Sequence, residues 1–120
     1  MRLALYQPDI AQNVGTTLRS CACFGVDVDI IEPCGFPFDD RKFRRAGMDY
    51  IDHVTYTRHL CWDSFLQWSK NENKRIVLLS SKASTPYTDF TFTAQDILMV
   101  GRESAGVPPE VAEECQHHIT

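Results

Sequence analysis

Two almost continuous apolar runs, at Arg75–Ser80 and Ile97–Val100, constrain the fold of this chain most strongly. Apolar runs without polar alternation are typical of strands that are covered on both faces, as in parallel sheets. The rest of the chain repeats an order of strand and then helix, which favours a sheet with helices on both faces. We therefore predict an α/β fold built on a mostly parallel sheet.

The periodicity of apolar residues predicts the other elements. The expected strands are Leu3–Tyr6, Val26–Ile31, Tyr50–Tyr56 and a short one at Phe90–Thr93, with another beginning after Gln116. The expected helices are Gly15–Phe24 with a stop at Gly25, 41–46 with a stop at Gly47, Leu60–Lys70 and Glu110–Cys115.

The chain has 120 residues, of which 43% are hydrophobic and 23% are charged, so residues 1–120 form one globular domain. The formal net charge of −4 argues against coating of long nucleic acid by net charge alone. No apolar run approaches the roughly 18 residues that span a bilayer, and the N-terminus lacks a signal-peptide pattern. We therefore expect a cytoplasmic protein without a membrane segment.

The five cysteines form neither a disulfide framework nor a common zinc spacing, because their number is odd and no C-x-x-C pair occurs. Cys21 and Cys23 are two positions apart on an expected helix, where side chains point in different directions. Cys115 with His117 and His118 lacks a fourth ligand at a recognisable spacing. We expect reduced thiols and no metal.

Ligands of open parallel sheets bind beyond the carboxyl ends of the strands. The loops Gln7–Asn13, Ser80–Ser84 and Gly101–Gly106 follow expected strands, so we expect them to converge on one site. The two commonest nucleotide-binding loops, G-x-G-x-x-G after the first strand and G-x-x-x-x-G-K-[ST], are absent. The site therefore needs another mode of binding.

Several stretches, taken in order, resemble the SPOUT superfamily of knotted methyltransferases, and within it the small tRNA 2'-O-methyltransferases of the wobble nucleotide. They are L-Y-Q-P-D-I-A-Q-N-V-G-T-T-L-R (Leu5–Arg19), I-I-E-P-C-G-F (Ile30–Phe36), R-R-A-G-M-D-Y (Arg44–Tyr50) and V-G-R-E-S-A-G-V-P (Val100–Pro108). The resemblance covers nearly the whole chain. It implies a trefoil-knot α/β fold, S-adenosylmethionine as methyl donor, the tRNA ribose 2'-hydroxyl as acceptor, and a homodimer whose active site is completed across the subunit interface.

The resemblance also implies site residues. Asn13, Gly15 and Arg19 match the first motif with its catalytic arginine, and Gly101 and Glu103 match the second. Cofactor contacts through backbone groups are implied near Leu79 and Gly101, with Gly106 allowing the loop to turn. Arg102 departs from the small residue or proline that is more usual before that glutamate.

Arg19 and Glu103 each have more than one chemical reading. A guanidinium with a pKa above about 12 is a poor general base, so we favour a role of Arg19 in stabilising a phosphate or the developing alkoxide. Deprotonation of the hydroxyl by Arg19 would require an unusually lowered pKa of its guanidinium. By residue type alone, Arg19 would be an ordinary surface arginine on a helix. Glu103 either orients Arg19, closes its own loop or is a solvated acid.

The run Arg41, Lys42, Arg44 and Arg45 is the best candidate for tRNA phosphate contacts on an otherwise acidic chain. A solvated basic helix face is the alternative reading.

The resemblance further implies that the final knot strand, a third motif bearing Ser and Asn, and a helix lie beyond this chain. We expect such a truncated sheet to expose Val77, Leu79 and Met99. An alternative function is therefore a catalytically incomplete, dimeric RNA-binding remnant of the same fold. The sheet pattern alone also leaves open an α/β nucleotide-binding regulator.

Overall fold

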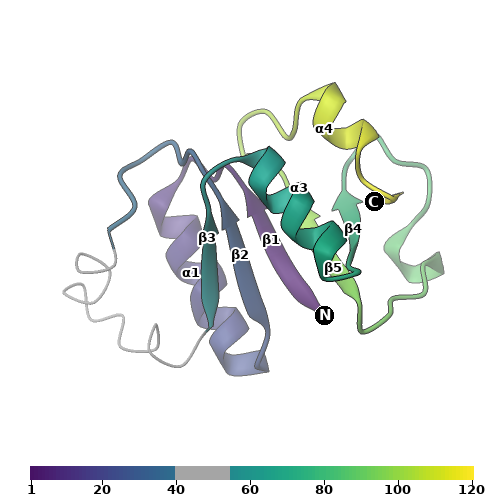
Figure 1. Cartoon of the computed structure of the whole chain (residues 1–120), viewed down its shortest axis with the longest axis horizontal. Coiled ribbons are helices and arrows are strands. Elements are labelled where there is room, and N and C mark those ends of the chain that lie inside the picture. Colours follow the sequence, from purple (N-terminus) through teal and green to yellow (C-terminus); the bar gives the residue numbers. More distant parts are fainter. Residues whose placement is uncertain (40–54) are drawn as a thin grey trace.

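The computed structural model describes residues 1–39 and 55–120, which contain one six-stranded sheet (Figure 1). Neighbouring strands are all parallel and follow the order β3-β2-β1-β5-β4-β6. The strands are β1 (Arg2–Tyr6), β2 (Asp27–Ile31), β3 (Tyr56–His59), β4 (Arg75–Leu79), β5 (Asp96–Val100) and β6 (His117–Ile119). The predicted parallel α/β fold is confirmed.

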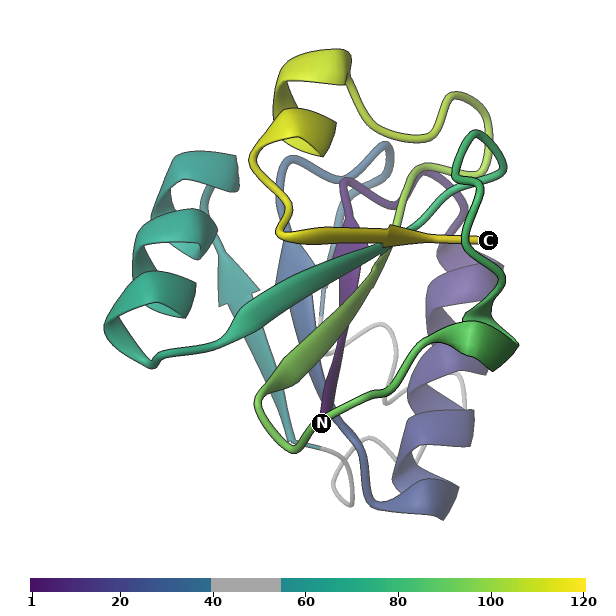
Figure 2. The same cartoon turned by 90° about the vertical axis from the view of Figure 1, so that its right-hand side faces the viewer.

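The helices cover both faces of this sheet, as Figure 2 shows. Helix α1 (Ala11–Phe24) packs on one face, and α3 (Trp62–Asn71) and α4 (Pro109–Glu113) pack on the other. A short 3-10 turn, η2 (Tyr87–Asp89), lies between β4 and β5 in the chain. None of the helices in the described residues is long and apolar enough to cross a membrane.

The apolar core is divided by the sheet into two layers. Val14 and Leu18 of α1 pack against Val28 and Ile30 of β2 in one layer. The other layer joins α3 and α4 to the strands through residues that include Phe65, Val111, Ile76 and Met99. Strand β1 contributes to both layers, because alternate residues of a strand point to opposite faces: Ala4 and Tyr6 lie in one and Leu5 in the other.

The expected exposure of Val77 and Met99 is wrong, because both side chains are fully buried. Strand β6 adds to the edge of β4 and pairs His117 with Val77, and the helices cover the faces of the sheet. The strand that was expected to begin after Gln116 is therefore present as β6. Leu79 is exposed as expected, at 39% of its surface.

Helix α1 begins at Ala11, earlier than the expected Gly15, because the backbone N–H groups of Asn13 and Val14 already bond to the carbonyl of Ile10. Gly25 ends the helix as predicted. It adopts a left-handed φ of 66°, and its N–H donates to the Cys21 carbonyl.

Two expected strands differ from the structure. Phe90–Thr93 is not a strand; instead Phe90 closes the turn at Tyr87, and Thr93 donates to the carboxylate of Asp96. Strand β3 begins only at Tyr56, the last residue of the expected Tyr50–Tyr56. Residues 50–54 of that strand, the expected helix 41–46 and the basic run Arg41, Lys42, Arg44 and Arg45 lie outside the described residues.

An ionic network around a buried aspartate links β1, β2 and β3. The carboxylate of Asp29 is fully buried and accepts hydrogen bonds from Arg2 Nε at 2.8 Å and Nη2 at 3.0 Å. His59 Nε2 lies 2.9 Å from the same carboxylate, and its ring packs against Phe65 and Trp68. None of its three residues lines the cavity described below.

Candidate functional site

A cavity of about 650 Å³ lies beyond the carboxyl ends of β4 and β5. Its walls are residues 78–82, the loop that follows β5, and parts of α4 and β6. Strands β4 and β5 are neighbours in the sheet, so the loops that leave them meet at one edge. This is the edge at which ligands of parallel sheets bind.

The three residues that the resemblance assigns to cofactor binding, Leu79, Gly101 and Gly106, all line this cavity. A Cβ atom on Gly101 would lie 2.7 Å from the Cα and carbonyl carbon of Gly106. Gly106 has a left-handed φ of 61°. Backbone hydrogen bonds of 3.0 and 2.8 Å between Arg102 and Gly106 close the loop, so its path depends on both glycines.

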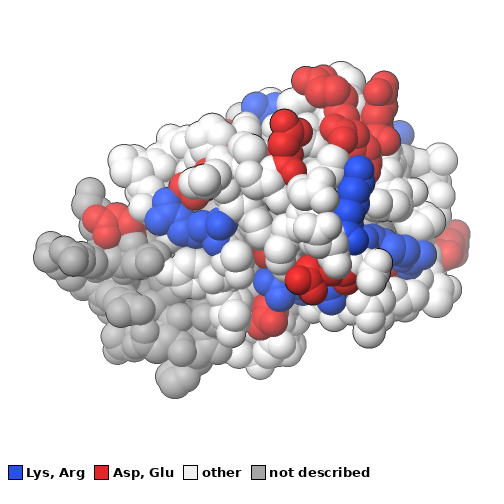
Figure 3. Space-filling view, in the orientation of Figure 1, with Lys and Arg blue, Asp and Glu red and all other residues white. Residues whose placement is uncertain are grey.

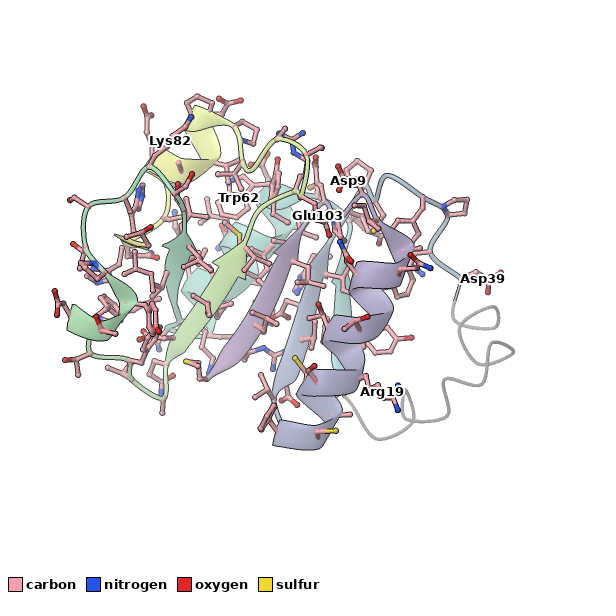
Figure 4. All side chains as sticks on the ribbon, turned by 180° about the vertical axis from the view of Figure 1, so that it is seen from behind. Asp9, Arg19, Asp39, Trp62, Lys82 and Glu103 are labelled. Carbon is pink, nitrogen blue, oxygen red and sulfur yellow. The ribbon has the colours of Figure 1, made fainter. Side chains whose placement is uncertain are left out.

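Glu103 connects this loop to the start of α1. Its carboxylate accepts hydrogen bonds from the backbone N–H of Asp9 at 3.3 Å and from Asn13 Nδ2 at 3.4 Å. Ser104 Oγ donates to Asp9 Oδ2, and Figure 4 shows Asp9 and Glu103 side by side.

Asp9 is a site residue that the sequence analysis did not single out. Gly35 packs so closely on Asp9 that a Cβ at this glycine would lie 2.7 Å from the Asp9 Cβ, and its N–H donates to the Pro8 carbonyl. Asp9 therefore joins the loops that follow β1, β2 and β5. Its place inside the first quoted stretch was the available signal, but an aspartate in a loop carries no distinctive spacing.

Arg19 lies apart from the cavity within one chain. It is exposed on α1, six residues after Asn13, which corresponds to about 9 Å along a helix axis. Figure 4 shows Arg19 farther along α1, away from the N-terminal end of the helix, beside which Asp9 and Glu103 lie. The hydrogen bonds of Glu103 go to Asp9 and Asn13, so the structure favours loop closure for this carboxylate.

The whole chain, residues 1–120, matches the protein family described as the SpoU rRNA methylase family. The chain belongs to this SpoU family.

Two curated relatives are similar to this SpoU chain. A protein of Beijerinckia indica subsp. indica is 63% identical over 109 residues, which are 91% of this chain and 68% of the relative. A protein of Ancylobacter novellus is 47% identical over 119 residues, which are 99% of this chain and 75% of the relative. Both are named tRNA (cytidine(34)-2'-O)-methyltransferase.

Solved structures share the fold of this SpoU chain. One, described as concerning 2-OH methylation of C/U34 on tRNA, is 33% identical with a TM-score of 0.87 and covers 99% of this chain and 73% of that one. Another is the SpoU methyltransferase AviRb from Streptomyces viridochromogenes in complex with AdoMet. It is 17% identical with a TM-score of 0.86, and the match covers 100% of this chain and 47% of AviRb. At this identity the match supports the fold alone.

The candidate metal ligands of this SpoU chain serve other contacts. Cys115 Sγ donates to the Val111 carbonyl, His117 Nε2 lies 3.2 Å from Arg75 Nη1, and His118 Nε2 lies 2.7 Å from the Ala112 carbonyl. Burial raises the pKa of Cys115 to about 12, which keeps it a thiol. Within residues 1–39 and 55–120, no group of three His, Cys, Asp or Glu side chains could hold a metal ion.

Proposed function

We propose that this chain transfers a methyl group from S-adenosylmethionine to the ribose 2'-hydroxyl of the wobble nucleotide, cytidine or uridine 34, of tRNA. One observation carries the proposal. This chain is 63% identical to a relative named tRNA (cytidine(34)-2'-O)-methyltransferase, and it has a cavity at the carboxyl ends of β4 and β5, where the cofactor is expected. We place the activity in the cytoplasm, where tRNA is modified, and in a homodimer.

The cavity fits S-adenosylmethionine in size and chemistry. Its volume of about 650 Å³ falls within the range of about 300–1,000 Å³ that is typical of small-molecule sites. Leu78, Leu79 and Val107 offer apolar walls for the nucleoside, and the glycines Gly101 and Gly106 place no side chain between a ligand and the backbone. Glu103 and Glu113 add negative charge, which suits a ligand with a sulfonium and an ammonium group.

When bound, S-adenosylmethionine supplies an electrophilic methyl group for an in-line displacement. Residues of this chain must then hold the ribose hydroxyl in line and stabilise the negative charge that develops on its oxygen. A guanidinium suits the second task, so we assign it to Arg19. Its distance from the cavity of its own chain supports a dimer in which Arg19 of the partner subunit acts at this cavity.

We assign phosphate contacts with tRNA to the basic run Arg41, Lys42, Arg44 and Arg45. Cations that neutralise phosphates make binding salt-dependent, and the slope of this dependence falls by roughly one for each such cation that is replaced. Replacing two of the four by glutamine should therefore weaken tRNA binding and reduce its salt slope by about two.

The deciding experiment combines calorimetry with methyl transfer. Titration with S-adenosylhomocysteine should show one site per subunit, and labelled S-adenosylmethionine should methylate tRNA transcripts that carry a 2'-hydroxyl at position 34. A transcript with a single 2'-deoxy substitution at that position should accept no label. Binding of tRNA without methyl transfer to any transcript would instead support the RNA-binding remnant.

A further inference from the structure

Arg102, the residue that departs from the family pattern, is held firmly against the cavity. Its Nε donates to the carbonyl of Gly106 at 3.0 Å, within the loop that its own backbone closes. Its guanidinium carbon lies 5.7 Å from the centre of the Tyr6 ring, which is only 4% exposed. A guanidinium over an aromatic face gains a cation–π interaction. The side chain is therefore fixed by two contacts before any ligand binds.

These contacts leave most of the hydrogen-bonding capacity of Arg102 unused. A guanidinium carries five N–H donors, and the bond to Gly106 uses the one on Nε. Within the described part of the chain, Nη1 and Nη2 donate to no acceptor, although Arg102 is partly buried and lines the cavity. The terminal nitrogens form a planar fork that matches a carboxylate or a phosphate with two parallel hydrogen bonds.

The charge around the cavity distinguishes these two anions. Figure 3 shows acidic side chains gathered over α4, the helix that forms one wall of the cavity. They are the exposed residues Glu110, Glu113 and Glu114. Of these, Glu113 lines the cavity, and the acidic surface of α4 disfavours a phosphate group at this wall. It attracts S-adenosylmethionine, whose sulfonium and ammonium groups outweigh its one carboxylate.

We propose that Arg102 binds the carboxylate of the methionine part of S-adenosylmethionine. The inference rests on the proposed function and adds to it a specificity-determining residue. Arg102 thereby selects ligands that carry the amino-acid tail over nucleosides that lack its carboxylate.

The test is a thermodynamic cycle that removes the Arg102 guanidinium and the ligand carboxylate, separately and together, and compares the binding free energies. Calorimetry would compare S-adenosylhomocysteine with its decarboxylated analogue, which keeps the nucleoside, the thioether and the amine. Arg102→Met keeps an unbranched stem over Tyr6 and removes the charge. Because a charge-assisted bidentate pair is among the stronger hydrogen bonds, this variant should bind S-adenosylhomocysteine at least about tenfold more weakly. Its affinity for the decarboxylated analogue should stay within about twofold of the unchanged chain.

Lys82→Met is the matched control, because Lys82 is the other lysine or arginine among the residues that line the cavity. It should preserve the preference for the carboxylate. Equal weakening of both ligands by Arg102→Met would overturn the proposal and make Arg102 a support of the loop. Loss of tRNA affinity with unchanged S-adenosylhomocysteine affinity would also overturn it and assign Arg102 to RNA. Failure of the unchanged chain to bind either ligand would instead overturn the proposed function, and the inference with it.

Discussion

The carboxylate of Glu103 accepts a hydrogen bond from the backbone N–H of Asp9 across a separation of 94 residues. Asn13 donates a hydrogen bond to the other oxygen of Glu103, and Ser104 donates one to the Asp9 carboxylate. These hydrogen bonds attach the cavity loop after β5 to the beginning of α1. They thus connect the part of the chain that carries Arg19 to the part that we assign to the cofactor.

Removing the Glu103 carboxylate should loosen the cavity loop. Hydrogen bonds to charged groups contribute about 1.5–3 kcal/mol when shielded, and less when exposed as here. We expect Glu103→Ala to weaken S-adenosylhomocysteine binding roughly three- to tenfold by calorimetry. Glu72→Ala, an exposed acid at the end of α3 that does not line the cavity, is the control and should leave binding within twofold. Equal effects of the two variants would mean that Glu103 acts only through charge.

Gly101→Ala should abolish cofactor binding, because the new Cβ would lie 2.7 Å from Gly106 backbone atoms. The loop would have to open, and the wall of the cavity would move with it. Gly25→Ala is a matched control: it meets no atom within 4 Å but has a left-handed φ of 66°. It should cost about 1 kcal/mol of unfolding free energy and leave binding unchanged. Full binding by Gly101→Ala would show that the loop is not part of the pocket.

Arg19→Ala should abolish methyl transfer while S-adenosylhomocysteine still binds, because Arg19 lies away from the cavity of its own chain. If Arg19 acts across a dimer, subunits of Arg19→Ala mixed with subunits of Gly101→Ala should recover activity. Each mixed dimer then holds one intact cavity facing one intact arginine. Recovery would be measured as label incorporated into tRNA after mixing and exchange of subunits. The absence of recovery, with subunit exchange demonstrated, would place Arg19 and the cavity of the same subunit in one site.

Asp29→Asn should strongly destabilise the fold. Burial opposes ionisation of Asp29, but hydrogen bonds from His59 and Arg2 outweigh it and lower the pKa of its carboxyl group. Removing one partner of a buried ion pair typically lowers the unfolding free energy by about 3–5 kcal/mol. Urea unfolding followed by tryptophan fluorescence would measure this loss. Asp27→Asn, half exposed on the same strand, is the control and should cost less than about 1 kcal/mol.

The same carboxylate should make the fold sensitive to acid. A group with a lowered folded pKa stabilises the protein fully above its unfolded pKa of about 3.9, and this stabilisation is lost as the pH falls through the folded value. The unfolding free energy should therefore fall below about pH 4, and less steeply in Asp29→Asn. Asp96, whose pKa Arg75 lowers in the same way, should retain part of the dependence.

Cys61, which is exposed, should be alkylated faster than Cys34 and Cys115. A hydrogen bond from Ser64, 3.2 Å from the Cys61 sulfur, lowers the pKa of this exposed thiol. Burial raises the pKa of Cys34 to about 11 and of Cys115 to about 12, so both remain protonated near neutral pH. Mass spectrometry after brief iodoacetamide treatment would give the order of labelling. Ser64→Ala should slow the reaction at Cys61 alone.

The local sequence pattern was sufficient to predict most strands of the sheet. The apolar runs that became β4 and β5 are mostly buried, so their composition reflects their environment directly. Gly25 ends α1 as expected, since a left-handed residue is a local requirement. The pattern failed at Phe90–Thr93, where alternating aromatic and threonine residues suit a strand but no neighbouring strand in the described part of the chain pairs with it.

The family resemblance was sufficient to group Leu79, Gly101 and Gly106, and the three line one cavity because each lies at or after the carboxyl end of a parallel strand. The partners of the site residues could not be read in this way. Glu103 meets Asp9 because β1 and β5 are neighbours in the sheet, and Val77 is buried because β6 pairs with β4. Strand order is a property of contacts between distant segments, and local periodicity contains no information about which strands become neighbours. The local pattern thus predicted most strands of the described residues. The cavity, the bond between Glu103 and Asp9, and the position of Arg102 over Tyr6 required the assembled sheet, because each joins segments that are distant in the chain.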